Sequence, residues 1–256
     1  MLFKVSRYGW LPDLPDHRDR LYAAPMEIAG ALPAKADLRA QCPPVYDQSQ
    51  LGSCTANAIA GAIQFDRMKQ MLSPVFTPSR LFIYYNERAM EHSIGSDSGA
   101  QIRDGIKSVN TKGVCPEKLL PYDPSKFTQK PSPDCYKVAL NNKVTSYQRL
   151  TQDLNQMKGC LADGFPFVFG FTCYESFESD AVAKSGILPM PKPKEKSVGG
   201  HAIMCVGFDD SKQVFIIRNS WGTSWGQKGY FTMPYAYATS NNLSDDFWTI
   251  RIVEEA

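Results

Sequence analysis

Apolar residues recur at helical spacing in the first half of the chain and follow strand-like patterns in the second half. The strongest helical pattern covers residues 54–72, whose first part is apolar on almost every side. A helix of that kind is buried within a protein rather than lying on its surface. Shorter helical patterns follow at residues 79–89 and 102–109, and the second of these ends near Gly113.

The segments that predict strands begin at about Val144. Two of them, residues 202–208 and 214–218, are strongly apolar and are separated by an Asp209-Asp210 turn. Weaker strand patterns cover residues 144–147, 165–171, 229–233 and 247–253, with a helix over about 152–162. A mainly helical half followed by a mainly β half predicts an α+β fold of two lobes.

These patterns divide the chain into an arm and two lobes. Residues 1–31 predict an extended arm, because Pro12 and Pro15 exclude a helix there. We expect the arm to pack along the body, across a groove, because it carries several large apolar side chains, namely Trp10, Leu11, Leu14 and Tyr22. Residues 32–143 are then the mainly helical lobe, and residues 144–256 are the mainly β lobe.

Composition excludes several classes of partner. The 256 residues include 28 basic and 26 acidic side chains, for a net charge of +2. This balance gives no electrostatic reason to expect nucleic acid or an anionic membrane as a partner. No apolar run is long enough to span a membrane, and the first residues lack the apolar core of a secretory signal.

The cysteines leave both redox state and compartment open. Seven of them are present, at positions 42, 54, 115, 135, 160, 173 and 205. An odd number fits one free thiol with up to three disulfides, and it fits seven reduced thiols equally well. The cysteine count favours a secreted or periplasmic location, whereas the missing signal favours the opposite. With three histidines and no C-x-x-C motif, we expect no metal site and no organic cofactor.

Cys54 is the candidate for chemistry that the helical pattern itself singles out. Turn residues end at Ser53, a good N-cap residue, so Cys54 falls in the first turn of the buried helix. The free N–H groups and the dipole of a helix start favour a thiolate, which lowers the pKa of a cysteine there. The alternative is a cysteine that only fills the core.

The β half offers partners for such a nucleophile. His201 precedes a strand, and Asn219 ends the next strand, so the two side chains are expected to meet. Trp221 would shield their hydrogen bond from water, and Gln48 would donate to an oxyanion beside the Cys54 amide. Considered singly, each residue also has a structural interpretation, as a hydrogen-bonded histidine, a tight turn or a solvated loop residue.

Together these residues form the pattern of a known family. The motifs run in the order Gln, Cys, His and Asn: Gln48, Gly52-Ser53-Cys54 before a helix, Gly200-His201-Ala202, Phe215-Ile216-Ile217-Arg218-Asn219-Ser220-Trp221-Gly222-Thr223-Ser224-Trp225-Gly226 and Gly229-Tyr230. Over residues 32–256 the chain resembles the papain-like cysteine proteases, and residues 9–19 resemble the arm of bacterial members. The resemblance implies a helical lobe and an antiparallel β lobe, with the active site in the cleft between them.

The resemblance also implies roles for individual residues. Cys54 matches the nucleophile, His201 the general base and acid, Asn219 the residue that orients the imidazole, and Gln48 the oxyanion donor. Cys54 and His201 would then rest as a thiolate–imidazolium pair. The positions matched to substrate binding are Gly99, Gly170, Gly199, Gly200 and Trp221. Gly99 would pair with the substrate backbone, and glycines at 170 and 199 would leave a roomy pocket for a large apolar or aromatic side chain.

The expected function is therefore that of a cysteine endopeptidase on peptide or protein substrates, working as a monomer. Two departures from the family signature are Leu51 in place of a cysteine and Thr55 in place of an aromatic residue. The chain lacks the His-His insertion of carboxy-dipeptidases in the family, which favours endopeptidase action. Two alternatives stay open: an acyl-transfer enzyme, such as a peptide ligase or deamidase, and an inactive homologue that binds peptides. The arm, as a pro-like segment, is expected to cover the cleft and restrain activity.

Overall fold

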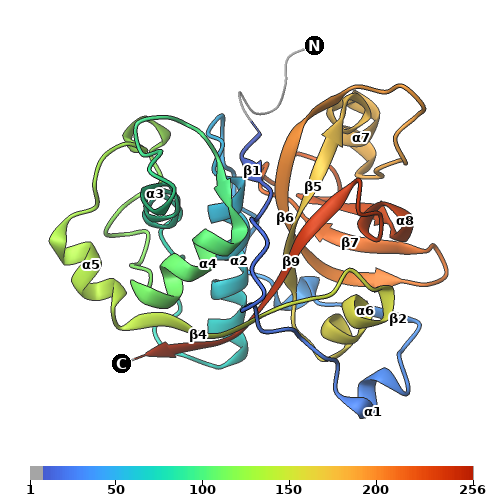
Figure 1. Ribbon diagram of the computed structural model, residues 1–256, viewed down its shortest axis with the longest axis horizontal. Coiled ribbons are helices and arrows are strands. Elements are labelled where there is room, and N and C mark those ends of the chain that lie inside the picture. Colours follow the sequence, from blue (N-terminus) through green and yellow to red (C-terminus); the bar gives the residue numbers. More distant parts are fainter. Residues whose placement is uncertain (1–7, 256) are drawn as a thin grey trace.

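The computed structural model describes residues 8–255, so the first seven residues of the arm lie outside the described part. Helices occupy one side of the molecule and a twisted sheet the other, with the arm running between them (Figure 1). This arrangement confirms the α+β fold with a helical part and an antiparallel β part.

The helical side is built around α2 (Cys54–Lys69), which is buried along almost its whole length. It packs against α3 (Arg80–Met90) and the sheet, while α4 (Ile102–Thr111) packs on α3. Helix α2 ends before the expected residue 72, because the exposed Met71 has a left-handed backbone conformation with φ 55°. The segment 114–135 contains a short 3-10 turn and the start of α5 (Pro133–Ala139).

The β side is a seven-stranded antiparallel sheet. Its main order is β4-β9-β5-β6-β7-β8, and β2 pairs with the outer half of β6. The strands are β2 (Lys35–Asp37), β4 (Asn142–Arg149), β5 (Phe167–Tyr174), β6 (Ser197–Asp209), β7 (Val214–Arg218), β8 (Tyr230–Pro234) and β9 (Ser244–Glu255). Short helices surround it: α1 (Met26–Ala29), α6 (Leu154–Ala162), α7 (Asp180–Ser185) and α8 (Tyr235–Ala238).

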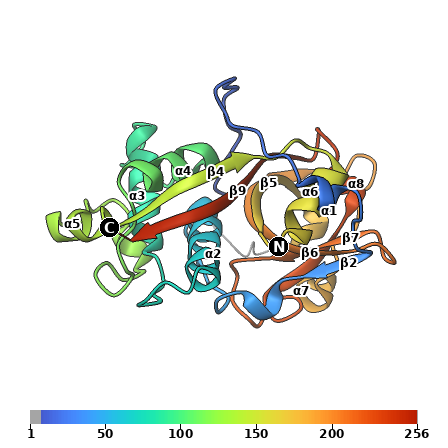
Figure 2. The ribbon, with the colours of Figure 1, turned by 90° about the horizontal axis from the view of Figure 1, so that it is seen from below.

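Two long strands tie the helical side to the sheet and carry the site. Strand β9 pairs with β5 near its start and with β4 along its second half, which extends beneath the helices (Figure 2). Strand β6 begins at Ser197, earlier than the apolar run predicts, because Gly199 and Gly200 also join the ladder to β5. His201 therefore lies inside a strand rather than at its mouth.

The arm enters the space between the helices and the sheet. Its short strand β1 (Trp10–Leu11) runs parallel to β3 (Ala100–Gln101), which leads directly into α4. Trp10 and Tyr22 are buried as expected. Leu11 and Leu14 are 39% and 70% exposed, so the expectation that every apolar anchor of the arm is buried was wrong for these two. Both side chains point away from the body because their neighbours Trp10 and Asp13 face it.

The remaining global features concern thiols, membranes and metals. All seven cysteines are free thiols. Across residues 8–255 no helix has both the length and the apolar character needed to cross a bilayer. In the same part of the chain, no group of three or more His, Cys, Asp or Glu side chains is arranged to hold a metal ion.

Candidate active site

The first residue of α2 is Cys54, and its side chain is completely buried. Ser53 occupies the N-cap position but makes no capping bond with its side chain. Its hydroxyl instead lies 2.6 Å from the Tyr122 hydroxyl and accepts a hydrogen bond from Asn57 Nδ2 at 3.0 Å. The backbone N–H groups at the start of α2 are thus left facing the neighbourhood of the sulfur.

Strand β6 brings the sheet to this sulfur. The backbone N–H of Ala202 donates a hydrogen bond to Cys54 Sγ over 3.3 Å. Because Ala202 follows His201 directly, the strand that carries the histidine packs against the start of α2, where the cysteine lies. The two residues come from opposite sides of the molecule and are separated by most of the chain.

The His201 ring is held in one orientation. Its Nε2 lies 2.8 Å from Asn219 Oδ1, an oxygen that also accepts from the backbone N–H of Ser220 at 2.8 Å. The Trp221 ring covers the pair, with its centroid 5.1 Å from that of the imidazole and an interplanar angle of 31°. His201 Nδ1 is buried and has no hydrogen-bond partner among the described residues, so it is the nitrogen left to exchange a proton.

Gln48 is fixed beside the same centre. Its Oε1 accepts from the Ser220 hydroxyl at 2.6 Å, and its Nε2 donates to the Leu51 carbonyl at 2.9 Å. The side chain is fully buried. One amide hydrogen is used by Leu51, which leaves the second hydrogen of Nε2 for another acceptor.

The arm lies directly over this centre. The Gly9 carbonyl accepts from the backbone N–H of Ala100 at 2.8 Å, and the Gly9 amide interacts with the Cys54 sulfur. A Cβ on Gly99, which has a positive φ of 74°, would lie 2.3 Å from the Gly9 carbonyl oxygen. The backbone strip expected to pair with substrate is therefore occupied by the protein's own arm.

Sequence analysis placed Gly170 and Gly199 in one pocket, but these two glycines face different side chains of the arm. A Cβ on Gly170 would lie 1.9 Å from Cε2 of Trp10, and one on Gly200 would lie 2.6 Å from its Cε3. Gly199 faces Tyr8 instead, at 2.6 Å from the Tyr8 Cβ. Gly170 and Gly200 thus enclose one large side chain, while Gly199 lies beside a second one.

Burial under the arm changes the charge state of both candidate catalytic groups. Burial raises the pKa of Cys54 to about 12, although the Ala202 and Gly9 amides act in the opposite direction. Burial lowers the pKa of His201 to about 4, opposed by the hydrogen bond that its Nε2 donates to Asn219 Oδ1. At neutral pH both groups are therefore uncharged. The expected thiolate–imidazolium pair was wrong for this arm-covered state, because the effect of excluding water outweighs the helix start.

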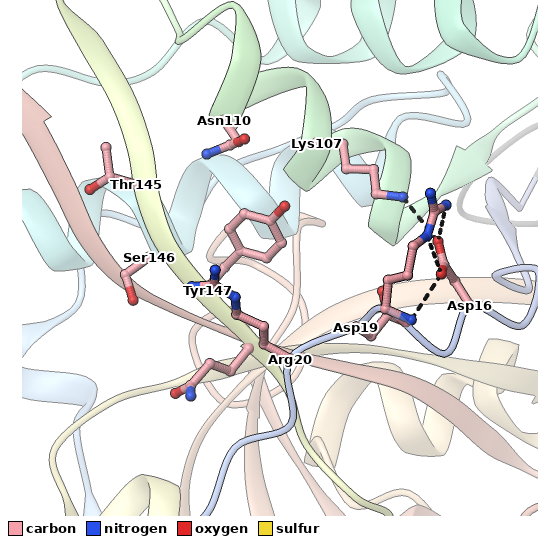
Figure 3. A pocket seen from close by; sticks show the side chains of 10 residues that line it. Asp16, Asp19, Arg20, Lys107, Asn110, Thr145, Ser146 and Tyr147 are labelled. Carbon is pink, nitrogen blue, oxygen red and sulfur yellow. Dashed lines mark hydrogen bonds and ion pairs between the residues drawn. The ribbon is translucent and has the colours of Figure 1, made fainter.

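An open cavity of about 460 Å³, whose lining does not include Cys54, lies between the arm, α4 and β4 (Figure 3). Its lining is polar and comes from the arm, α4 and β4, including Asp16, Arg20, Lys107 and Tyr147. Asp16 is one of its lining residues and pairs with Arg18 and Lys107. No residue that sequence analysis assigned to the site lines this cavity.

Sequence analysis missed two residues that hold the site and its cover. Ser220 orients Gln48, and its place directly after Asn219 was the available signal. Asp246 in β9 accepts a hydrogen bond from Trp10 Nε1 at 3.0 Å. Nothing in the sequence marks this contact, because the two residues are 236 positions apart.

Comparison with known proteins agrees with this geometry. The profile of the Papain family cysteine protease matches residues 32–246, which is most of the chain. The chain belongs to the papain family of cysteine proteases. An uncharacterized peptidase C1-like protein of Acanthamoeba polyphaga mimivirus is 44% identical to it over 98% of this chain and 89% of the viral one.

Solved structures of this papain-family fold include one that is similar along its full length. The crystal structure of xylellain, a cysteine protease from Xylella fastidiosa, has 48% sequence identity and a TM-score of 0.91, covering 99% of both chains. Bromelain from Ananas comosus, solved with the E64 inhibitor, has a TM-score of 0.65 at 19% identity over 84% of this chain and 97% of its own. At that identity bromelain shows the fold alone. This chain is thus a papain-family cysteine peptidase, and peptides or proteins are its substrates.

Proposed function

We propose that this peptidase is an endopeptidase in which Cys54 is the nucleophile and His201 the general base and acid. The observation that carries the proposal is the hydrogen bond from Ala202 to Cys54 Sγ, beside a histidine whose Nε2 is held by Asn219. A nucleophile, a base and a third group that orients the base form the arrangement that nucleophilic catalysis needs. Because all these residues come from one chain, we propose that a monomer is active.

In the proposed reaction, Cys54 loses its proton to His201 Nδ1, and the sulfur attacks the carbonyl carbon of the peptide. The oxyanion accepts hydrogen bonds from the Cys54 backbone N–H and from the second hydrogen of Gln48 Nε2, each worth about 3–4 kcal/mol. His201 then gives its proton to the leaving amine, and a thioester remains. Water, deprotonated by His201, hydrolyses the thioester and restores the thiol.

The cleft filled by the arm indicates which substrates fit. Gly170 and Gly200 enclose the Trp10 indole, which supports a pocket for a large apolar or aromatic side chain two residues before the cleaved bond. The Gly99 strip would pair with an extended substrate through main-chain hydrogen bonds, as it does now with Gly9. Selectivity then depends on the pocket rather than on the strip.

The arm is proposed to restrain this activity. A substrate that uses the Gly99 strip and the pocket must displace Gly9 and Trp10, since both regions are filled while the arm is docked. Docking also keeps Cys54 and His201 uncharged, so the arm opposes both binding and chemistry. The peptidase would therefore be latent until the arm moves.

The decisive test measures hydrolysis of fluorogenic peptides with an aromatic residue in the proposed pocket position. Cys54→Ala should abolish turnover, while the thermal melt should change little. Cys42→Ala is the matched control, because the Cys42 thiol is half-buried and interacts with the Leu38 carbonyl and with Tyr230 rather than with the candidate site. Mass spectrometry of the products, with an added amine, separates hydrolysis from acyl transfer. Equal turnover in both variants would overturn the assignment of Cys54.

A further inference from the structure

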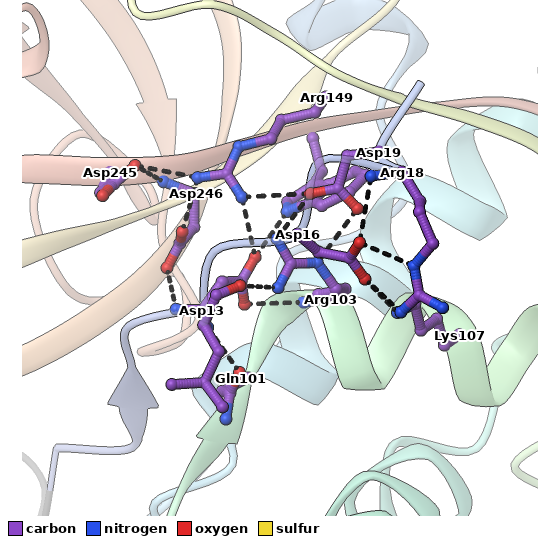
Figure 4. Close-up of polar contacts among 12 residues, drawn as sticks. Asp13, Asp16, Arg18, Asp19, Gln101, Arg103, Lys107, Arg149, Asp245 and Asp246 are labelled. Carbon is purple, nitrogen blue, oxygen red and sulfur yellow. Dashed lines mark hydrogen bonds and ion pairs between the residues drawn. The ribbon is translucent and has the colours of Figure 1, made fainter. Parts of the chain in front are cut away.

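The arm is fixed to the body by a buried group of charges that we call the arm cluster (Figure 4). It consists of Asp13 and Asp19 from the arm, and of Arg103, Arg149 and Asp246 from the body. Arg103 pairs with Asp19 at 2.5 Å, and Arg149 lies 3.5 Å from Asp19, 3.7 Å from Asp13 and 3.1 Å from Asp246. The arm cluster joins the start of α4, the end of β4 and the start of β9.

Asp13 also caps a helix of the body. Its Oδ1 accepts from the backbone N–H of Arg103 at 3.0 Å, in the first turn of α4, and its Oδ2 accepts from Trp248 Nε1 at 2.8 Å. Gln101, the N-cap residue of α4, makes no capping bond with its own side chain. The arm therefore supplies the cap that the helix lacks.

Asp246 in the body accepts hydrogen bonds from two positions of the arm. Its Oδ2 accepts from Trp10 Nε1 at 3.0 Å and from the backbone N–H of Asp13 at 2.7 Å, while its Oδ1 accepts from Arg149. The side chains of Asp13 and Asp246 are both fully inaccessible to water. Docking the arm thus places the carboxyl group of Asp13 beside the buried carboxyl group of Asp246.

The charges of the arm cluster do not balance when the arm is docked. Three carboxylates surround two guanidinium groups, which leaves one uncompensated negative charge; the side chains of Asp13 and Asp246 are inaccessible to water, while that of Arg149 is 22% exposed. An uncompensated buried charge is costly, and taking up a proton removes that cost. Burial, followed by the charge of Asp13, accordingly raises the pKa of Asp246 to about 7, and burial raises that of Asp13.

Other charged groups surround the arm cluster without balancing it. Asp245, with its side chain 55% exposed, adds a negative charge beside Arg149. The other groups near the arm cluster are Asp16, Arg18, Glu91, Asp104, Lys107 and His17, which lines an open cavity together with Asp13, Asp19 and Arg149. Arg18 and Lys107 are engaged with Asp16 at the edge of the cavity in Figure 3, and Glu91 accepts from the Gln101 amide.

We propose that docking of the arm is coupled to the binding of a proton by the arm cluster, so that rising pH releases the arm and exposes the cleft. The inference rests on the proposed function only in taking the arm as the restraint on activity. When the arm leaves, Asp246 loses Asp13 as a neighbour and gains water, so its pKa falls. The docked form therefore holds the additional proton. Docking is strongest in mild acid and weakens as the pH rises through about 7.

The test follows the arm itself and needs no turnover. Hydrogen exchange of arm amides in residues 8–20 is measured by mass spectrometry in the full chain carrying Cys54→Ala, and the rates are corrected for intrinsic pH dependence. Between about pH 5.5 and about pH 8.5, a group with a docked pKa of about 7 should increase the opening equilibrium about 30-fold. Because the readout is amide exchange and not turnover, the result is independent of the assigned chemistry.

Three variants, each made in the full chain carrying Cys54→Ala, test whether the arm cluster binds the proton. Asp246→Asn resembles the protonated acid, and it should give the same arm protection at both pH values. Asp13→Asn lies in the arm, leaves the body intact and should also remove the response. Asp16→Asn is the control: Arg18 holds the pKa of this carboxyl well below its usual range, so its loss should weaken docking equally at both pH values. Equal exchange at both pH values in the parent chain, or a persistent response in both Asp246→Asn and Asp13→Asn, would overturn the proposal.

Discussion

Two consecutive residues directly after β7, Asn219 and Ser220, serve the two sides of the proposed reaction. Asn219 holds the imidazole, and Ser220 holds the Gln48 amide so that its Nε2 faces the start of α2. The two are coupled further, because the Ser220 backbone N–H donates to Asn219 Oδ1. A shift of this short segment would thus misplace the base and the oxyanion donor together.

Ser220→Ala tests this role at the level of one hydroxyl group. Without the bond to Oε1, the Gln48 amide can rotate away, so kcat should fall about five- to tenfold, which corresponds to about 1 kcal/mol. KM should change little, because Ser220 is buried and does not line the groove filled by Trp10. Steady-state kinetics against the parent chain measure both constants. The exposed Ser211, replaced by alanine, is the control, and a Ser220→Ala variant with the parent's kcat would contradict the role.

At the level of elements, local patterns could be predicted and long-range contacts could not. Strand β7 matches its predicted bounds, because it is a short apolar run between turns. Strand β6 is longer than predicted, because Gly199 and Gly200 carry no side chain that would signal a strand. The order of Gln48, Cys54, His201 and Asn219 pointed to a site by family resemblance. The anchoring of the arm at Asp246 depends on residues far apart in sequence, and no local pattern contains that information.

The pairing of β2 with β6 gives a prediction for stability. Gly207 lies opposite Asp37, and a Cβ there would lie 2.4 Å from the Ala36 carbonyl oxygen, a backbone atom that cannot turn aside. Gly207→Ala should therefore force β2 away from the sheet and lower the free energy of unfolding by about 1–3 kcal/mol. Urea unfolding measures the change. Gly95→Ala is the control, because no atom lies within 4 Å of its added Cβ, and equal stability of the two variants would refute the argument.

For the whole molecule, the proposed function makes the reactivity of Cys54 depend on where the arm is. The helix start and the sheet position the sulfur and the imidazole, yet the docked arm closes both to water and leaves them uncharged. The same contacts that fill the cleft, from Gly9 and Trp10, also bring Asp13 to the arm cluster. If the arm restrains the enzyme as proposed, activity, cleft access and arm docking form one coupled equilibrium rather than three separate properties.

This coupling predicts that one side chain of the arm controls alkylation of the nucleophile. At about pH 6, which is below the docked pKa of Cys54 and above that of His201, the pair is neutral and covered, so iodoacetamide should modify Cys54 slowly. Trp10→Ala removes the indole that fills the pocket and its bond to Asp246, so the arm should open and alkylation should accelerate at least about tenfold. Peptide mapping by mass spectrometry gives the rate at Cys54 alone. Leu14→Ala, at a side chain 70% exposed on the same arm, should leave the rate unchanged; equal rates in the parent and in Trp10→Ala would show that the arm does not govern access to the thiol.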